Sequence, residues 1–429
     1  MNNNSSTTEN ISVSIILRLF IPFALGYFLS HHFRAVNAII STDLVKDTGI
    51  NALQLGTVSG IYFLAFALSQ LPSGILLDKI GPRRTDAGLL LFAALGAIIF
   101  GSGVSLGQLL IGRFLIGFGV SCACMAAFKA FVMWLPKHQL PFANGCLMAA
   151  GGMGILASTI PVEAALKITD WRGVYYTLAG VTLVASAFIY FVVPDKEVEA
   201  SNESLSEQIS GLLEIFESRY FWRVIPFAIT VEGGIIGFFT LWTVPWLRDV
   251  AGFDREQIAN GMFIIALSMI IGFPFFGYLA SRLNKIGIST LTVTVVGMII
   301  SIVLGAVVMF RLTDYHLVAW VLFMFFATSS ILIFAVMSQY FPKKLSGRAN
   351  TAANFLLFLG AFATQAGVGA ILNPFEVTGG GVGYSLDGYD LVAKIFIGLQ
   401  ILGLCWYVLF GLLVKDTSQV KDEVAVDSQ

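Results

Sequence analysis

The strongest constraint on this chain is a series of twelve apolar stretches, each about long enough to cross a lipid bilayer. A membrane-spanning helix needs about 20 mostly apolar residues, and short clusters of turn-forming and charged residues separate the stretches. The stretches are 13–40, 51–78, 86–106, 108–134, 141–166, 172–193, 219–247, 255–281, 288–310, 316–340, 349–373 and 390–414. The first is too long for a signal-peptide core, so we expect it to remain as a helix. The sequence therefore predicts an all-α membrane protein with twelve transmembrane helices.

The composition excludes several other classes of protein. Only 12% of the 429 residues are charged and 57% are hydrophobic, whereas soluble domains are about 25% charged. The formal net charge of −1 gives no sign of nucleic-acid binding. The four cysteines lie in apolar stretches without metal-ligand spacing to a histidine, and the chain has neither a phosphate-binding loop nor a nucleophile–base spacing. We therefore expect no metal, no cofactor and no enzymatic activity.

The basic residues indicate how the chain is oriented in the membrane. With twelve spans, 15 of the 25 Lys and Arg residues fall on the side of the N-terminus and seven on the other side. Arg34, Arg113 and Lys129 lie within spans. Because loops that face the cytoplasm are enriched in Lys and Arg, we expect both termini in the cytoplasm, with the protein in a bacterial inner membrane.

An internal repeat divides the twelve stretches into two sets of six. Gly49 and Gly74 recur 203 residues later as Gly252 and Gly277, on either side of a polar interval rich in Glu and Ser. Two similar halves imply a pathway at their interface and transport by rocking of one half on the other. The expected units are an N-terminal half (1–194), a cytoplasmic linker (195–218), a C-terminal half (219–414) and a cytoplasmic tail (415–429).

Two short motifs carry a resemblance to a known family. Residues 74–84 read GILLDKIGPRR, which matches the signature G-x-L-x-D-[RK]-x-G-x-[RK]-[RK] of the major facilitator superfamily. Residues 113–119, RFLIGFG, are similar to its second signature R-x-x-x-G-x-G. The pair Trp171-Arg172 before the sixth stretch also resembles members of the superfamily. The chain is thus identified as a member of that superfamily, close to bacterial porters of organic anions, sugar phosphates and small nutrients. This resemblance implies a secondary transporter that works by alternating access.

The first motif predicts a gate. Asp78 ends the second stretch, where it can accept hydrogen bonds from a helix N-terminus or a basic side chain, and the glycines allow close helix approach and a tight turn. Such contacts hold one side closed in one state and break in the other. The alternative is that these charges only fix topology. We expect gating roles for Gly74, Asp78, Gly81, Arg83, Arg84 and Arg113, the last from its place in the second signature, with packing or proton coupling as its other expected roles.

Arg34 is the leading candidate for substrate binding. A charged side chain inside a membrane span is energetically costly, so such a residue usually has a functional role. At about 100° per residue, Tyr27, His31 and Arg34 share one helical stripe, and His32 falls on another face. Arginine offers a planar fork for carboxylate or phosphate, so the stripe predicts an anion clamp. The alternative is an arginine that reaches outward to the interface.

Lys129 is the second candidate cation for the substrate. It lies about 160° around its helix from Arg113, so the two cannot face one pocket. Anion-carrying branches of the superfamily have a cation low in span 4 ahead of an aromatic-x-Pro ending, and the stretch 129–136 is similar. The alternative is a lysine that reaches the cytoplasmic surface.

The second half offers one charged candidate, Glu232, followed by two glycines. It is expected to take up the coupling proton, with a substrate ammonium or an interfacial position as alternatives, and His31 is the other candidate proton carrier. Glu163 is expected to be interfacial. Polar or aromatic residues that would line the pocket are Trp242, Asn354 and Gln365.

These observations predict a monomeric, proton-coupled importer of a small carboxylate- or phosphate-bearing nutrient, which includes amino acids. The alternatives are a proton-driven exporter of drugs or siderophores, whose pocket would be broad and apolar, and a non-transporting sensor on the same fold. The expected partners are the substrate, protons and the lipid bilayer, with no nucleic acid.

Overall fold

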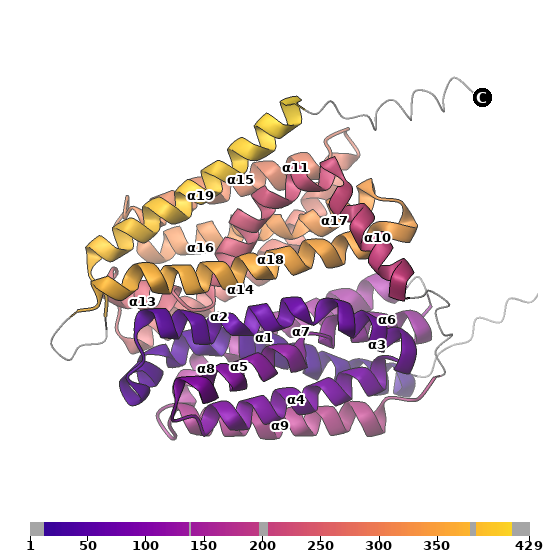
Figure 1. Ribbon diagram of the computed structural model, residues 1–429, viewed down its shortest axis with the longest axis horizontal. Helices are drawn as coiled ribbons and strands as arrows, with labels where there is room; N and C mark the ends of the chain where they lie inside the picture. The colour runs from indigo at the N-terminus through magenta and orange to yellow at the C-terminus, as the bar shows by residue number, and fades with distance from the viewer. Residues whose placement is uncertain (1–12, 137–138, 197–204, 378–382, 414–429) are drawn as a thin grey trace, which may run out of the picture.

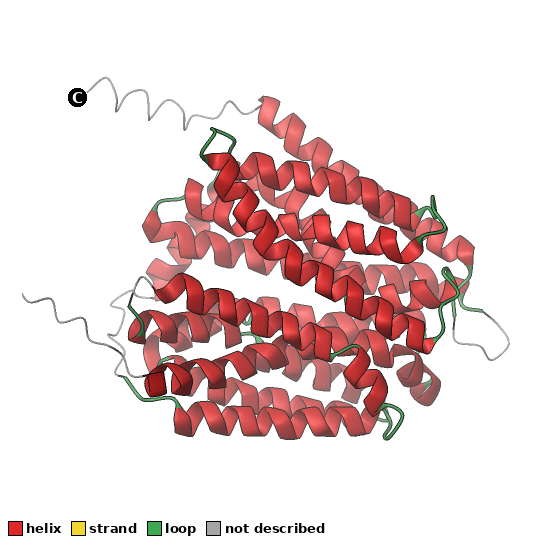
Figure 2. Ribbon diagram, turned by 180° about the vertical axis from the view of Figure 1, so that it is seen from behind, coloured by secondary structure: helices red, strands yellow, loops and turns green. Residues whose placement is uncertain are grey.

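The computed structural model describes residues 13–136, 139–196, 205–377 and 383–413. These residues form long helices joined by short turns (Figure 2), with a single isolated β-bridge between Glu376 and Tyr384. Parts of the expected linker and the expected tail 415–429 lie outside the described residues.

Two groups of helices lie side by side, one from each half of the sequence (Figure 1). The first contains α1 (Val13–Thr48), α2 (Ala52–Leu68), α3 (Gln70–Ile80), α4 (Pro82–Gly101), α5 (Leu106–Val120), α6 (Ala123–Trp134), α7 (Leu140–Ala157), α8 (Ile160–Ala165) and α9 (Trp171–Val192). The second follows α10 (Leu205–Glu217) and contains α11 (Arg219–Ala228), the π-helix η2 (Ile229–Gly233), α12 (Gly234–Phe239), α13 (Thr243–Asp249), α14 (Arg255–Asn284), α15 (Thr290–Met309), α16 (His316–Ala327), the 3-10 helix η3 (Thr328–Leu332), α17 (Ile333–Tyr340), α18 (Lys343–Leu372), the 3-10 helix η4 (Asn373–Phe375) and α19 (Leu386–Leu413).

The helices of the described part are consistent with the twelve spans expected. Ten helices in the described part are long and apolar enough to cross a membrane, and α2 with α3 makes an eleventh if this pair, bent by 50°, is one span. With its 36 residues, α1 also exceeds the length that a crossing requires. Pro72 follows the bend at Ser69, where the lack of a proline N–H weakens helical hydrogen bonding.

The sequence repeat corresponds to a turn and a helix start that have the same geometry in both halves. Gly49 and Gly252 both have a positive φ, 67° and 68°, a conformation that glycine adopts without strain. Each precedes a capping box, which Gln54 closes at the start of α2 and Gln257 closes at the start of α14. The repeated residues therefore turn the chain and begin the next helix in the same way in both groups.

The groups meet most closely where α2 packs against α18. Gly56 of α2 faces the backbone carbonyl of Gln365, and Gly369 of α18 faces the carbonyl of Ala52. A Cβ atom at either glycine would overlap the facing oxygen, so only glycine permits this approach.

Candidate substrate site

Polar contacts join the two groups of helices at one end of the bundle. This end, where α1 turns into α2, is called the Gly49 end. Arg255 of α14 pairs with Asp43 of α1 at 2.7 Å and with Glu163 of α8 at 2.9 Å. Glu163, expected to be interfacial, is therefore half of an ion pair that crosses between the groups.

A second set of contacts at the Gly49 end caps α2 from the other group. The backbone N–H of Ala52 donates to Glu376 Oε1 at 2.5 Å, and that of Leu53 donates to Asn373 Oδ1 at 3.4 Å. The first N–H groups of a helix have no partner within the helix, so residues of the second group satisfy donors of the first. Closure of this end thus stabilises the start of α2.

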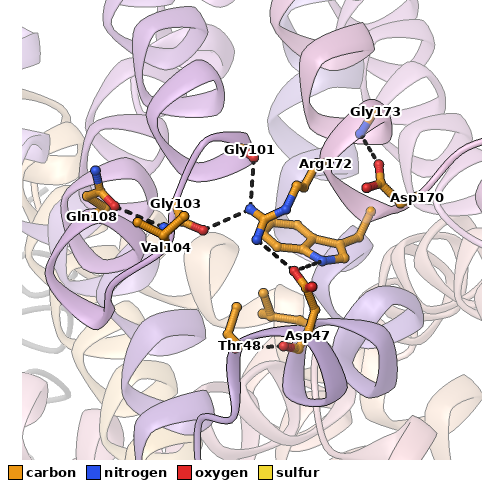
Figure 3. A network of polar contacts seen from close by, with 11 residues as sticks. Asp47, Thr48, Gly101, Gly103, Val104, Gln108, Asp170, Arg172 and Gly173 are labelled. Atoms are coloured by element: carbon orange, nitrogen blue, oxygen red, sulfur yellow. Dashed lines mark hydrogen bonds and ion pairs between the residues drawn. The ribbon is translucent and has the colours of Figure 1, made fainter.

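The Trp171-Arg172 pair stabilises the first group at the same end. Figure 3 shows Arg172 between α1 and the end of α4, where it donates to Asp47 Oδ2 at 2.6 Å and to the carbonyls of Gly101 and Gly103 at 3.1 and 2.8 Å. The Trp171 indole also donates to Asp47, at 3.2 Å. The contacts lie within one group, so they brace the group without linking it to the other.

The first signature occupies the opposite end, called the Gly81 end, where α3 turns into α4. Asp78 of α3 accepts a hydrogen bond from Lys129 of α6 at 2.5 Å, and Arg84 pairs with Asp195 at 3.0 Å. Arg83 donates to the carbonyl of Val193 at 3.3 Å. Gly81 has a φ of 83°, as the predicted tight turn requires, and nothing lies within 4 Å of a Cβ added at Gly74.

The expected substrate contact of Lys129 changes with this structure. Its ammonium is bound to the Asp78 carboxylate, and an ammonium already paired is not free to receive an anion. The expected substrate contact is therefore not supported, and Lys129 is instead the partner of the motif residue Asp78. The sequence placed both residues near one membrane surface but gave no reason to pair them.

Arg113 lies in the interior of the first group. Its side chain is buried, donates to the carbonyl of Phe33 at 2.9 Å and to the Tyr175 hydroxyl at 3.3 Å, and stands 5.0 Å from the centre of the Tyr62 ring. These contacts connect α5 to α1, α2 and α9. These contacts support a packing role for Arg113, which was one of the roles expected from the sequence. They do not support a gating role.

Arg34 lies between the two groups. Its guanidinium carbon is 5.4 Å from the centre of the Phe66 ring of α2 and 5.0 Å from that of Phe358 of α18. It is half-buried, its Nε is buried without a hydrogen-bond partner, and within the described part of the chain it forms no ion pair. The aromatic faces stabilise the cation by cation–π attraction and leave its fork unoccupied.

The other residues of the predicted stripe also lie at this site. The Tyr27 and His31 rings meet edge to face with centroids 4.4 Å apart, and the Tyr27 hydroxyl donates to Met148 Sδ at 3.6 Å. Gly151 of α7 lies against both rings. His32 is buried and stacks on Phe28, on another face as expected.

Glu232 approaches the same centre from the second group. It lies in the π-helix η2, accepts a hydrogen bond from Ser330 of η3, and interacts electrostatically with Arg34. Among the described residues it forms no ion pair. Two irregular helical segments therefore meet at one carboxylate, and π-helical turns frequently occur at functional sites. Gly233 lies against the carbonyl of Leu357, which brings η2 close to α18. Glu232 therefore does not lie at the membrane interface, which was one of the alternatives expected from the sequence.

Two of the three expected lining residues serve helix packing instead. Trp242 is fully buried, and its indole donates to the Gln365 carbonyl at 3.0 Å. The Gln365 side chain is also buried and donates to Thr240 at 2.8 Å. Both residues belong to the α2–α18 contact, so we remove them from the substrate site. Asn354, half-buried one turn before Phe358, stays a candidate.

Sequence reasoning missed the two rings that hold Arg34. Phe66 and Phe358 are two of the 37 phenylalanines of the chain, most of which lie in apolar stretches, and each belongs to a different half. No local signal in the sequence distinguishes them from core residues that serve packing alone.

Comparison with known proteins assigns the family. The model of the Major Facilitator Superfamily matches residues 23–364. The probable sulfoacetate transporter of Cupriavidus necator is 24% identical over 61% of this chain and 64% of its own length. The probable galactarate/D-glucarate transporter of Escherichia coli is 23% identical over 92% of this chain and 93% of its own length.

A solved structure has the same fold. That of a bacterial homologue of the human lysosomal transporter Spinster, in an inward-facing and unoccupied conformation, superposes with a TM-score of 0.76 at 14% identity and covers 93% of this chain and 97% of its own. The helical architecture and the family match agree with the signature motifs. The chain belongs to the Major Facilitator Superfamily and is an integral membrane protein.

Proposed function

We propose that this protein imports a small organic anion, whose carboxylate, phosphate or other oxyanion group binds Arg34. The observation that carries this proposal is the Arg34 guanidinium between the two groups of helices, which has no ion-pair partner in the described part of the chain. An unpaired charge in a low-dielectric interior is unfavourable, and an incoming anion would relieve this cost. The forked guanidinium can hold two oxygens of one anionic group at once.

The names of the similar transporters support an anion. The two relatives described above are named for sulfoacetate and for galactarate or D-glucarate, all of which are organic anions. Their identity to this chain is low, so they support the chemical class of the substrate and not a particular compound. Tyr27 and His31 lie beside Arg34 and offer further hydrogen-bonding groups to the rest of the substrate.

The proposed coupling ion is a proton that Glu232 carries. This carboxyl faces Arg34, the cation proposed to bind the substrate, from the other group of helices. The Ser330 hydroxyl donates a hydrogen bond to it. An anion on Arg34 would change the charge that Glu232 experiences, which links substrate binding to protonation. Import of an anion together with protons would follow from such a link.

The proposed cycle alternates between closure at the two ends. In this structure Arg255 joins the groups at the Gly49 end, whereas Asp78 and Lys129 pair within one group at the Gly81 end. From the excess of basic residues on this side, the Gly81 end is proposed to face the cytoplasm. The structure then corresponds to a state closed toward the outside.

The experiment that tests the function is a thermal-shift screen on the purified protein. Organic anions, phosphate esters, amino acids and neutral analogues are compared, because a ligand at 100 times its dissociation constant stabilises by about 2.7 kcal/mol. We expect stabilisation by one class of anion and none by the neutral analogue of the same shape. Equal stabilisation by both would contradict anion recognition, and the anion found is then tested for uptake into proteoliposomes.

A further inference from the structure

A second carboxyl group is buried in the first group of helices, away from the site described above. Asp86, in the second turn of α4, is fully buried, and neither of its carboxyl oxygens has a hydrogen-bond partner in the described part of the chain. Gly26 of α1 lies directly opposite, since a Cβ atom added there would stand 3.4 Å from Asp86 Oδ2.

The groups that face Asp86 are neutral. From α1 it meets Gly26, against which Ile189 of α9 also lies. The Ser186 hydroxyl of α9 donates to the carbonyl of the adjacent Ala87 at 2.7 Å. From the break between α5 and α6 the titratable groups are the thiols of Cys122 and, further away, Cys124.

The two arginines on the same helix are committed elsewhere. Arg83 donates to the Val193 carbonyl and Arg84 pairs with Asp195, both at the surface of the Gly81 end. Asp86 therefore has no cation to stabilise a negative charge among the described residues. A buried ionised carboxylate without a partner is strongly unfavourable, so such a group takes up a proton instead.

Polar side chains lie at the break between α5 and α6, near Asp86. Cys122 lies at the break between α5 and α6, directly after Ser121, and the Ser73 and Ser121 hydroxyls lie 3.4 Å apart. A break in a spanning helix is a place where two helical segments can move relative to each other. Movement there would admit water to Asp86.

We propose that Asp86 is a second proton-binding site of the transporter, protonated in this conformation and deprotonated when the α5–α6 break opens to water. In the first state the O–H bond is intact, and in the second its proton passes to water and leaves a hydrated carboxylate. Together with Glu232, each group of helices would then carry one exchangeable proton. The role in transport rests on the proton coupling proposed above, but the protonation of Asp86 does not.

Infrared spectroscopy tests the protonation directly. Purified protein labelled with ¹³C-aspartate should show the C=O stretch of a protonated aspartate at neutral pH, and Asp86→Asn should lose it. The matched control is Asp195→Asn, which changes an exposed aspartate at the same end of the bundle and should keep the band. Absence of the band from the labelled wild-type protein would overturn the proposal, even if the variants fail to fold.

Proton counting tests the role in transport. In proteoliposomes, Asp86→Asn should move fewer protons for each substrate molecule than the wild type, while exchange of labelled for unlabelled substrate continues. Asp86→Thr serves as a second variant if the asparagine protein does not fold. An unchanged proton ratio in a folded variant would refute the coupling role of Asp86. If the wild type moves no protons with substrate, the proposed symport is wrong, and the infrared result decides the protonation of Asp86 by itself.

Discussion

The ion pairs of Arg255 offer a quantitative test of closure at the Gly49 end. Arg255→Gln removes the contacts with Asp43 and Glu163, which are the only hydrogen-bond partners of this guanidinium among the described residues. An exposed ion pair contributes about 0.2–1 kcal/mol, whereas breaking a fully buried pair costs about 3–5 kcal/mol. The Glu163 side chain is only 12% exposed and that of Arg255 is 50% exposed, so the combined loss lies between these limits, near 2 kcal/mol.

That loss applies only to the state in which the Gly49 end is closed. Because every 1.4 kcal/mol is a factor of ten, Arg255→Gln should shift the population toward the open state about 10- to 30-fold. Spin labels at the exposed positions Lys46 and Glu256, one in each group, would report the change as a longer distance in pulsed electron paramagnetic resonance. The labels require serine in place of the accessible native cysteines.

The matched control is Arg311→Gln. Arg311 forms a comparable ion pair with Asp390 at 2.5 Å, but both residues belong to the second group. This variant loses a similar charge and a similar contact without affecting the junction between groups. The distance distribution should stay that of the wild type. If both variants lengthen the distance equally, or if Arg255→Gln leaves it unchanged, the reasoning about this junction is wrong.

Three further predictions concern gate, coupling and packing. Asp78→Asn removes the charge that holds Lys129, so substrate binding in detergent should persist while uptake slows; equal loss of both would contradict a gating role. Glu232→Gln should abolish accumulation against a gradient but preserve exchange of labelled for unlabelled substrate, whereas loss of exchange would indicate a substrate ammonium at this residue. Gly56→Ala places a methyl group against the Gln365 carbonyl, so the spin-label distance at the Gly49 end should increase, and an unchanged distance would show that α2 and α18 can adjust.

Much of the architecture follows from local sequence signals. Apolar length alone locates most spans, and Gly49 with its capping glutamine marks the same turn that Gly252 makes in the second half. The stripe of Tyr27, His31 and Arg34 needs only helical periodicity. Each of these features depends on residues close together in one stretch, which is why the sequence is sufficient.

The parts that the sequence did not predict depend on contacts between distant stretches. Lys129 and Asp78 lie 51 residues apart, and their pairing depends on how α6 packs against α3. Phe66 and Phe358 form cation–π contacts with Arg34 only because α2 and α18 meet.

Asp86 was missed for a different reason. It closely follows Arg83 and Arg84, at the first residue of the expected span 86–106, and no sequence pattern there marks a buried carboxyl group. Its burial results from the packing of α4 against α1 and α9.

The central claim is that Arg34 binds the anionic group of the substrate. The most direct test is the dissociation constant of the best anion from the thermal-shift screen, measured by calorimetry on wild-type protein and on Arg34→Lys. Lysine keeps the charge but loses the fork, so affinity should fall at least tenfold, about 1.4 kcal/mol. Arg84→Lys, the same exchange at the surface, should bind as the wild type does. An unchanged dissociation constant in folded Arg34→Lys protein would remove Arg34 from the site and contradict the account.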